Sequence, residues 1–244
     1  MTPKFMLLNV AACAALTVSA ATDASTHRQA PDPVANPSAV VRQGNARFTV
    51  LTPEMIRVEY SPSGKFEDKA TFAVVNRNLP VPEFQKKESA DSLFITTGKL
   101  RLAYKKGADL IKNGQALNIT FEVAGKPERW FPGKKDTQNL KGTLRTLDTN
   151  NGDAFRNKLE DGVISRSGWA VIDDSWSNVR PDGSRSFAME PNAEAGMDWV
   201  TDRADKDALD LYFLGYGHDY KRAIADFTRI AGAVSYTHLT LPTN

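Results

Sequence analysis

The amino-acid sequence predicts a mainly β protein, an antiparallel β-sandwich followed by a single helix near the C-terminal end. Two observations carry this prediction. Apolar and polar residues alternate with a period of two in short runs separated by turn-forming residues, as in strands with one buried face. The runs are Ala46–Leu51, Met55–Tyr60, Ala70–Val75, Ser92–Thr97, Lys99–Tyr104 and Leu117–Val123. One segment alone, at residues 219–232, has a clear helical period, so strands do not alternate with helices as they do in a parallel sheet.

The first two runs predict a β-hairpin, because a short turn containing proline separates them. Ile56, Val58 and Tyr60 share one face of the second strand, while Arg57 and Glu59 share the other. We therefore expect the first face to join the core and the second face to contact water.

The helical segment has signals at both of its ends. Asp219 is suited to cap the N-terminus, and Gly232 stands where a C-terminal cap belongs. Between them, apolar residues recur on one stripe, which is expected to face the sheets. The stripe consists of Tyr220, Ala223, Ile224, Phe227, Ile230 and Ala231.

Composition excludes several classes of function. The 244 residues include 31 Lys and Arg against 29 Asp and Glu, so a net charge of +2 gives no electrostatic signal for nucleic-acid binding. A single Cys excludes a disulfide framework and a multi-cysteine metal site, and three His make a histidine-rich metal site unfavourable. We expect a globular protein with neither cofactor nor metal and with no nucleic-acid partner.

The N-terminal residues resemble a secretory signal. A short positive start is followed by an apolar run from Phe5 to Val18 and then by small residues at 18–21. This predicts a signal peptide at 1–21, a flexible leader at 22–38, and export to the periplasm or the cell surface without a membrane span. An alternative is processing at Cys13, because Val10-Ala11-Ala12-Cys13 resembles a lipoprotein box.

Few residues suggest chemistry on their own. Asp173 and Asp174 are neighbours in a strand, so their side chains point to opposite faces and cannot flank one glycosidic bond; a strand-end turn is favoured. A structural role at the helix start is favoured for His218. The tryptophans could stack on sugars, but core positions are favoured in a sandwich. They are Trp130, Trp169, Trp176 and Trp199.

Three long strings carry a family resemblance. We refer to them as motif 1 (139–148, NLKGTLRTLD), motif 2 (162–175, GVISRSGWAVIDDS) and motif 3 (210–224, DLYFLGYGHDYKRAI). In order and spacing they resemble the N-terminal region of bacterial glycoside hydrolase family 31, the α-glucosidase and α-xylosidase family. The resemblance spans residues 39–233 and places a sandwich at 39–215 and a helical connector at 216–233.

The resemblance implies a galactose-mutarotase-like N-terminal sandwich that packs against a (β/α)₈ barrel. In the family the barrel carries two catalytic Asp residues that act with retention and without a cofactor on α-linked glucosides or xylosides. No residue of this chain is matched to them, so no catalytic residue is assigned. A sandwich loop reaches the sugar site in the family, and Asp148 is its best match here. We expect Asp148 to bind a sugar hydroxyl; a turn-forming role is the alternative.

The last residues depart from the family pattern. Residues 234–243 resemble the translation of a transposase sequencing adapter, so we expect 234–244 to be an adapter-encoded tail. The expectation is therefore the N-terminal part of an exported α-glycosidase, inactive alone, whose partners are its catalytic barrel and an α-linked oligosaccharide. Apolar surface that faces the barrel would then be exposed. The alternatives are a stand-alone carbohydrate-binding sandwich and a surface lipoprotein anchored through Cys13.

Overall fold

A computed structural model describes residues 32–141, 161–176, 187–190 and 199–232. The chain divides into two units, and every described residue belongs to the unit formed by residues 29–234. The expected signal peptide, Asp148, Cys13 and the expected tail at 234–244 lie outside the described residues.

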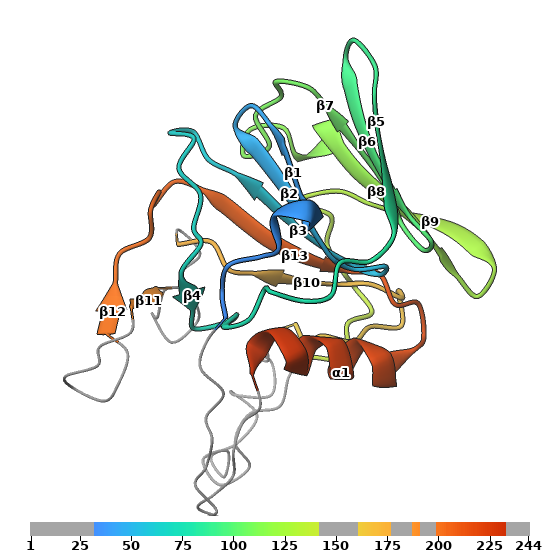
Figure 1. Ribbon diagram of the computed structural model, residues 1–244. Coiled ribbons are helices and arrows are strands. Elements are labelled where there is room, and N and C mark those ends of the chain that lie inside the picture. Colours follow the sequence, from blue (N-terminus) through green and yellow to red (C-terminus); the bar gives the residue numbers. More distant parts are fainter. Residues whose placement is uncertain (1–31, 142–160, 177–186, 191–198, 233–244) are drawn as a thin grey trace, which may run out of the picture. The chain divides into compact units, whose positions relative to one another are not determined.

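The described part is built mainly from three antiparallel sheets, which confirms the predicted fold class (Figure 1). Sheet 1 has the order β1-β2-β3-β13-β10, with β1 at Val40–Gln43, β2 at Ala46–Thr52, β3 at Met55–Tyr60, β13 at Leu209–Leu214 and β10 at Ala170–Asp173. Sheet 2 has the order β5-β6-β7-β8-β9, with β5 at Phe84–Glu88, β6 at Ser92–Thr97, β7 at Arg101–Lys105, β8 at Leu117–Val123 and β9 at Lys126–Trp130.

A smaller sheet and three helical segments complete the described elements. Sheet 3 joins β12 (Trp199–Thr201), β11 (Ala188–Glu190) and β4 (Ala70–Thr71). The helical segments are the 3₁₀ turns η1 (Pro37–Ala39) and η2 (Gly114–Ala116) and the α-helix α1 (Tyr220–Ala231). None of the described helices is long and apolar enough to cross a membrane.

The strand predictions hold where alternation and turn signals agree. The β2–β3 hairpin forms as expected, and β6 and β8 have the predicted bounds. The strand expected at Ala70–Val75 stops at Thr71, because the Thr71 hydroxyl accepts a hydrogen bond from the backbone N–H of Val74 at 3.0 Å and bends the chain. Residues 32–38, placed in the leader by the sequence, have partners here: the backbone N–H of Arg77 donates to the Asp32 carbonyl at 2.8 Å.

The core lies between sheet 1 and sheet 2. Aromatic side chains join the two sheets, since the Phe213 ring lies 4.8 Å from the Trp130 ring and 5.4 Å from the Phe121 ring. Trp130 and Trp169 are buried in this core, as predicted. Trp176 is half-buried against Phe187, and the side chain of Trp199 lies outside the described part of the structure.

Helix α1 covers the face of sheet 1 that points away from sheet 2. The Asp219 carboxylate accepts a hydrogen bond from the backbone N–H of Arg222 at 3.2 Å, and Gly232 ends the helix at a φ of +83°, as predicted. The expected apolar stripe was wrong in part, because Ile224 is 46% exposed while Asp226 is buried. The helix docks along Ala223, Asp226 and Ile230, and the Tyr216 hydroxyl, two residues after β13, donates a hydrogen bond to the Asp226 carboxylate.

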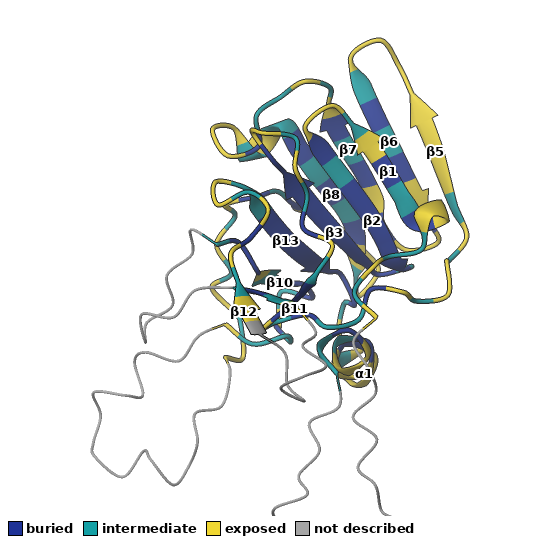
Figure 2. Ribbon diagram, turned by 60° about the vertical axis from the view of Figure 1, so that its left-hand side comes forward, coloured by how far each residue is buried: buried dark blue, intermediate teal, exposed yellow. Residues whose placement is uncertain are grey.

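The expectation that one face of the hairpin contacts water through Arg57 and Glu59 was also wrong. Arg57 and Glu59 are only 1% and 2% exposed. Figure 2 shows β3 and β13 buried, in contrast to the exposed edge strand β5. The reason is long-range: the segment at 67–77 and the loops around Asp174 and Arg203 cover this face and supply charged partners.

Candidate functional site

Motifs 2 and 3 lie side by side at one edge of sheet 1. Strand β10 from motif 2 pairs with β13 from motif 3, from Ala170 opposite Leu214 to Asp173 opposite Leu211. The pairing continues past the strands, because the backbone N–H of Gly217 donates to the Gly168 carbonyl at 2.9 Å. The His218 ring lies 3.0 Å from the Arg166 carbonyl, which agrees with the structural role favoured for this histidine.

The first residues of motif 1 lie beside motif 2. The backbone N–H of Leu140 donates to the Ile164 carbonyl at 3.1 Å. The Asn139 side chain receives a hydrogen bond from the Gly162 N–H at 2.8 Å and returns one to its carbonyl at 3.0 Å. These bonds hold together the two ends of the segment that carries Asp148. Asp148 itself lies outside the described residues.

The paired carboxylates of motif 2 have separate structural tasks. The Asp173 carboxylate accepts a hydrogen bond from the Ser175 N–H at 3.0 Å, which is the strand-end turn that the sequence favoured. Asp174 is fully buried and accepts a hydrogen bond from the Thr71 hydroxyl at 2.7 Å and another from Arg203 at 3.3 Å. The two carboxylates therefore do not face a common space.

Asp174 belongs to a buried charge cluster that sequence reasoning missed. At its centre, Arg57 donates two hydrogen bonds to the Asp210 carboxylate, at 2.8 and 2.7 Å. Arg203 bridges the Asp210 and Asp174 carboxylates, and Glu59 lies 3.1 Å from Arg57. We call Arg57, Glu59, Asp174, Arg203 and Asp210 the buried charge cluster.

Asp210, at the centre of the cluster, is not suited to proton transfer. Burial opposes ionisation of the Asp210 carboxyl, but the charge and hydrogen bonds of Arg57 and the charge of Arg203 outweigh it and hold its pKa well below the usual range. Asp210 is only 2% exposed. A carboxylate that stays ionised and shielded from water suits a structural ion pair rather than a general acid or base.

A polar hollow of about 660 Å³ lies beside the N-terminus of α1. Glu54, Tyr216 and Arg222 line it, the last two from motif 3. The Oε2 atom of Glu54 is buried without a hydrogen-bond partner among the described residues, although the Arg222 guanidinium lies 3.4 Å away. Burial raises the pKa of the Glu54 carboxyl. This oxygen could accept a hydrogen bond from a hydroxyl group that enters the hollow.

We expect Glu54→Gln to raise the free energy of unfolding at pH 7. A carboxyl whose pKa is higher in the folded chain favours the fold below its unfolded pKa, and that contribution is lost as pH rises through the folded pKa. At pH 7 the buried charge therefore opposes folding, and the neutral amide removes this cost. Urea unfolding at pH 7 and pH 4 should show that the gain shrinks on acidification.

The matched control is Glu122→Gln, an exposed carboxylate that lines the same hollow. It should change the free energy of unfolding by no more than about 0.5 kcal/mol. A Glu54→Gln variant that is less stable than the wild type at pH 7 would show that the ion pair with Arg222 outweighs burial.

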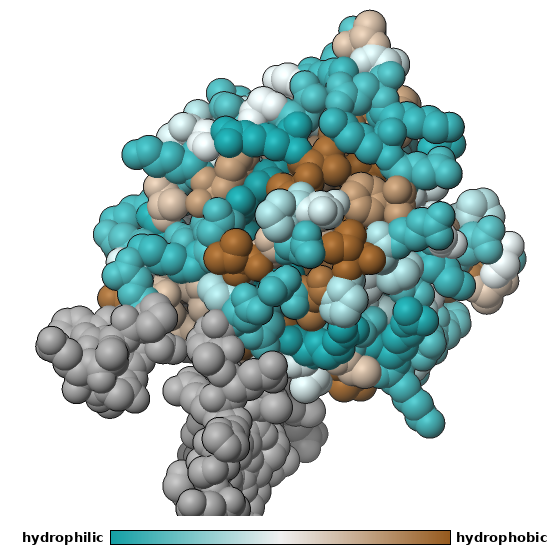
Figure 3. Space-filling view, in the orientation of Figure 1, coloured by the Kyte–Doolittle hydropathy of each residue, from teal (hydrophilic) through white to brown (hydrophobic). Residues whose placement is uncertain are grey.

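An apolar hollow of about 490 Å³ lies between sheet 3 and the segment that precedes η1. Figure 3 shows apolar side chains gathered near the centre of the face that Figure 1 presents, surrounded by hydrophilic ones. Val34, which lines the hollow, is 57% exposed. The apolar lining consists of Pro33, Val34, Phe66, Ala70, Met189 and Ala204.

The described residues bring no three His, Cys, Asp or Glu side chains together as a metal site would require. The polar and charged side chains described above gather at three places: the junction of the three motifs, the Glu54 hollow and the buried charge cluster.

Comparison with known proteins finds solved structures that are similar to this chain. No protein-family model matches the chain, and no curated protein matches it. Among solved structures it is similar to a dextranase of glycoside hydrolase family 31 from Flavobacterium johnsoniae. The likeness to a complex of a mutant of this dextranase with isomaltotriose has 16% identity and a TM-score of 0.42. The likeness to its glucose complex has 17% identity and a TM-score of 0.35.

Both likenesses cover 77% of this chain and 26% of the dextranase chain. The chain therefore spans about a quarter of the length of these structures. At such identity the likeness concerns the fold alone.

Proposed function

We propose that this chain forms the N-terminal sandwich of an exported α-glycosidase of family 31 and supports a (β/α)₈ barrel that follows α1. The barrel would supply the two catalytic Asp residues and hydrolyse α-linked glucosides or xylosides with retention. The sandwich would contribute the segment that carries Asp148, which would bind a hydroxyl of the α-linked oligosaccharide.

The observation that carries this proposal is the meeting of the three motifs. They are far apart in the sequence, yet motif 2 pairs with both of the others through backbone hydrogen bonds. A single surface is thereby formed from the base of the Asp148 segment, the edge strand β10 and the helix that would lead into the barrel. The three motifs resemble the same family and lie together in the structure, which supports the proposal that they act together in supporting the barrel.

The buried acids of motifs 2 and 3, Asp174 and Asp210, fit a supporting role. Retaining glycosidases need two carboxyl groups about 5–5.5 Å apart, on either side of the bond that breaks. Asp174 and Asp210 are instead buried and bound to guanidinium groups. Catalysis by a pair of Asp residues in the barrel is compatible with this arrangement.

Recovery of the natural gene downstream of the Gly232 codon tests the proposal. We expect it to encode a (β/α)₈ barrel, and the continued protein to hydrolyse aryl α-glucosides or α-xylosides with retention of configuration. A downstream sequence without a barrel, or a continued protein without turnover, would contradict the proposal. Sugar binding without turnover would instead favour a stand-alone carbohydrate-binding sandwich.

Asp148→Ala in the continued protein tests the substrate contact. Loss of hydrogen bonds to a charged group should raise KM roughly 10- to 100-fold, since such bonds contribute about 1.5–3 kcal/mol. Initial-rate kinetics with an α-linked disaccharide would measure it. The control is Asp161→Asn, at the base of the same segment, where the carboxylate pairs with Lys141. An Asp148→Ala variant with an unchanged KM would favour the turn-forming role.

Export and anchoring are tested separately. With the native N-terminus, the protein should be recovered from the periplasm or the cell surface. Cys13→Ser should leave the distribution unchanged if cleavage occurs near residue 21. Loss of membrane association in Cys13→Ser would instead identify a lipoprotein.

A further inference from the structure

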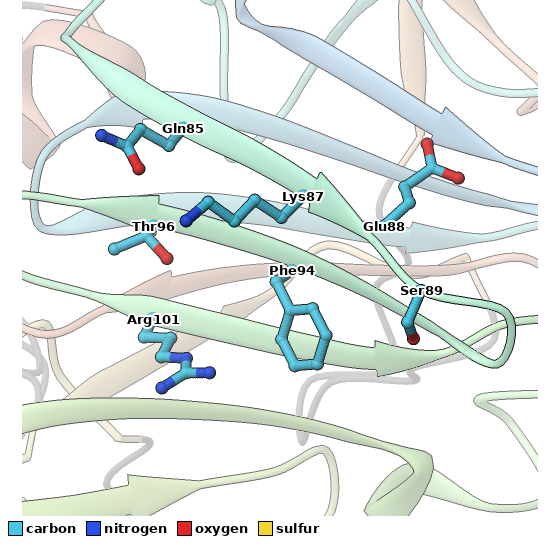
Figure 4. A pocket seen from close by; sticks show the side chains of 7 residues that line it. All are labelled: Gln85, Lys87, Glu88, Ser89, Phe94, Thr96 and Arg101. Atoms are coloured by element: carbon cyan, nitrogen blue, oxygen red, sulfur yellow. The ribbon is translucent and has the colours of Figure 1, made fainter.

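The outer face of sheet 2 carries a hollow of about 480 Å³ that the proposed function does not use. Gln85, Lys87, Phe94, Thr96 and Arg101 line it, together with the turn after β5. Figure 4 shows side chains of β5, β6 and β7 around this hollow. The core residues of sheet 2 point to the other face, toward sheet 1.

Strand register places these side chains in two adjacent rows. Lys87 and Phe94 belong to the shorter row. Gln85, Thr96, Arg101, Thr120 and Arg129 follow one another across five strands. Neighbouring strands are about 4.8 Å apart, so this row is roughly 19 Å long. An extended polymer could therefore contact several of its residues at once.

The face carries an excess of positive charge. Lys87, Lys105, Arg101 and Arg129 point outward, against one carboxylate, that of Glu122. Among the described residues, none of these four cations forms an ion pair with a carboxylate.

Glu88, at the rim of the hollow, does not neutralise these cations. Lys86 and Lys106 lie 2.8 and 2.7 Å from its carboxylate oxygens. Their hydrogen bonds lower the pKa of Glu88 to about 2, so it stays ionised and paired with them. The cations of the hollow therefore remain available to an anionic ligand.

Phe94 supplies a second kind of contact. Its ring is half-buried, and the Arg101 guanidinium lies 5.4 Å from the ring centroid. An aromatic ring beside hydroxyl, amide and guanidinium groups fits a sugar ring, whose apolar face packs on the aromatic while its hydroxyls form hydrogen bonds. A guanidinium also binds a carboxylate through paired hydrogen bonds.

We infer that the outer face of sheet 2 binds an acidic polysaccharide, with Arg101 and Lys87 contacting uronate carboxylates and Phe94 packing against a sugar ring. Sheet 2 and α1 pack on opposite faces of sheet 1. Lys87 and Phe94 line only the outer hollow, whereas Thr96 and Arg101 also line the polar hollow beside Glu54, so the two hollows adjoin at Arg101. Binding of the acidic polysaccharide does not depend on the proposed catalysis.

Binding of polygalacturonate to the full chain, measured by isothermal titration calorimetry, tests the inference. We expect binding that weakens with added salt, because exposed charges are screened. Arg101→Gln and Phe94→Ala should each weaken it at least tenfold. Lys65→Gln, which removes an exposed positive charge elsewhere, should leave it unchanged. Phe94 points out of the core, so matched thermal unfolding of the variants should show that the fold persists.

Comparison polymers distinguish recognition of an acidic sugar from general attraction of polyanions. A neutral glucan should bind at least tenfold more weakly than polygalacturonate. Polyglutamate, an acidic polymer without sugar rings, should bind without dependence on Phe94. Absence of polygalacturonate binding would overturn the inference. It would also be overturned if the neutral glucan bound with the same affinity as polygalacturonate. The same holds if Phe94→Ala or Arg101→Gln bound polygalacturonate as tightly as the wild type.

Discussion

Asp210→Asn is expected to lower the free energy of unfolding by about 3–5 kcal/mol, the range for removing one partner of a buried ion pair. The Asp210 carboxylate receives hydrogen bonds from Arg57 and pairs with Arg203, and all three side chains are at most 3% exposed. The neutral amide would leave two buried guanidinium groups without their main counter-charge. Urea unfolding followed by circular dichroism at pH 7 measures the change.

The pH dependence of this loss identifies its cause. The pKa of Asp210 is lower in the folded chain than in the unfolded chain, so its charge stabilises the fold above an unfolded pKa of about 4. That contribution is lost as pH falls through the folded pKa. The gap between the wild type and Asp210→Asn should therefore narrow below pH 4.

The control for Asp210 is Asp202→Asn, because Asp202 pairs with Lys206 at 2.7 Å on the surface. It should change the free energy of unfolding by no more than about 1 kcal/mol. A loss below 1 kcal/mol in Asp210→Asn, or a loss that does not vary with pH, would show that the buried charge cluster contributes little.

Gly168→Ala is expected to lower the free energy of unfolding by about 2–5 kcal/mol through two effects. Its φ of +76° costs an L-residue about 1–2 kcal/mol. A Cβ there would also lie 2.5 Å from a methyl group of Val123 and 3.1 Å from the Cα of Gly217, which adds about 1–3 kcal/mol of overpacking. The close approach of Val123 and Gly217 to residue 168 therefore requires glycine.

Gly107→Ala separates the two effects in Gly168→Ala. Gly107 has a φ of +73°, and a Cβ there would meet nothing within 4 Å. It should therefore show the backbone cost alone, by the same urea measurement. Equal losses in the two variants would mean that Val123 and Gly217 move aside at no cost in free energy.

The sequence predicted the features that depend on local patterns. Alternation placed the β2–β3 hairpin, and the caps at Asp219 and Gly232 placed α1. It could not show that Arg57 is buried, because its partners are the distant Asp210 carboxylate and Glu67 carbonyl. Glu59 is buried with it, since its carboxylate pairs with Arg57 and Arg47. Period two gives the face of a strand but not what covers it.

The same limit applies to the candidate sites. Motif order predicted that the strings belong together, but the pairing of Asn139 with Gly162 follows from the fold. Asp226 is polar, so it was not included in the predicted apolar stripe of the helix. It is buried because its carboxylate accepts a hydrogen bond from the Tyr216 hydroxyl at 2.9 Å. The cationic row on sheet 2 becomes visible only when strand register aligns Arg101 and Arg129.

The most direct test of a supporting, non-catalytic sandwich is the turnover of aryl α-glucosides and α-xylosides by the full chain itself, once circular dichroism has shown that it is folded. We expect a rate equal to that of buffer, because the bond-breaking carboxylates would belong to the barrel. Hydrolysis above that rate that disappears in Asp174→Asn or Glu54→Gln would contradict this role, since the reacting acids would then lie within the sandwich.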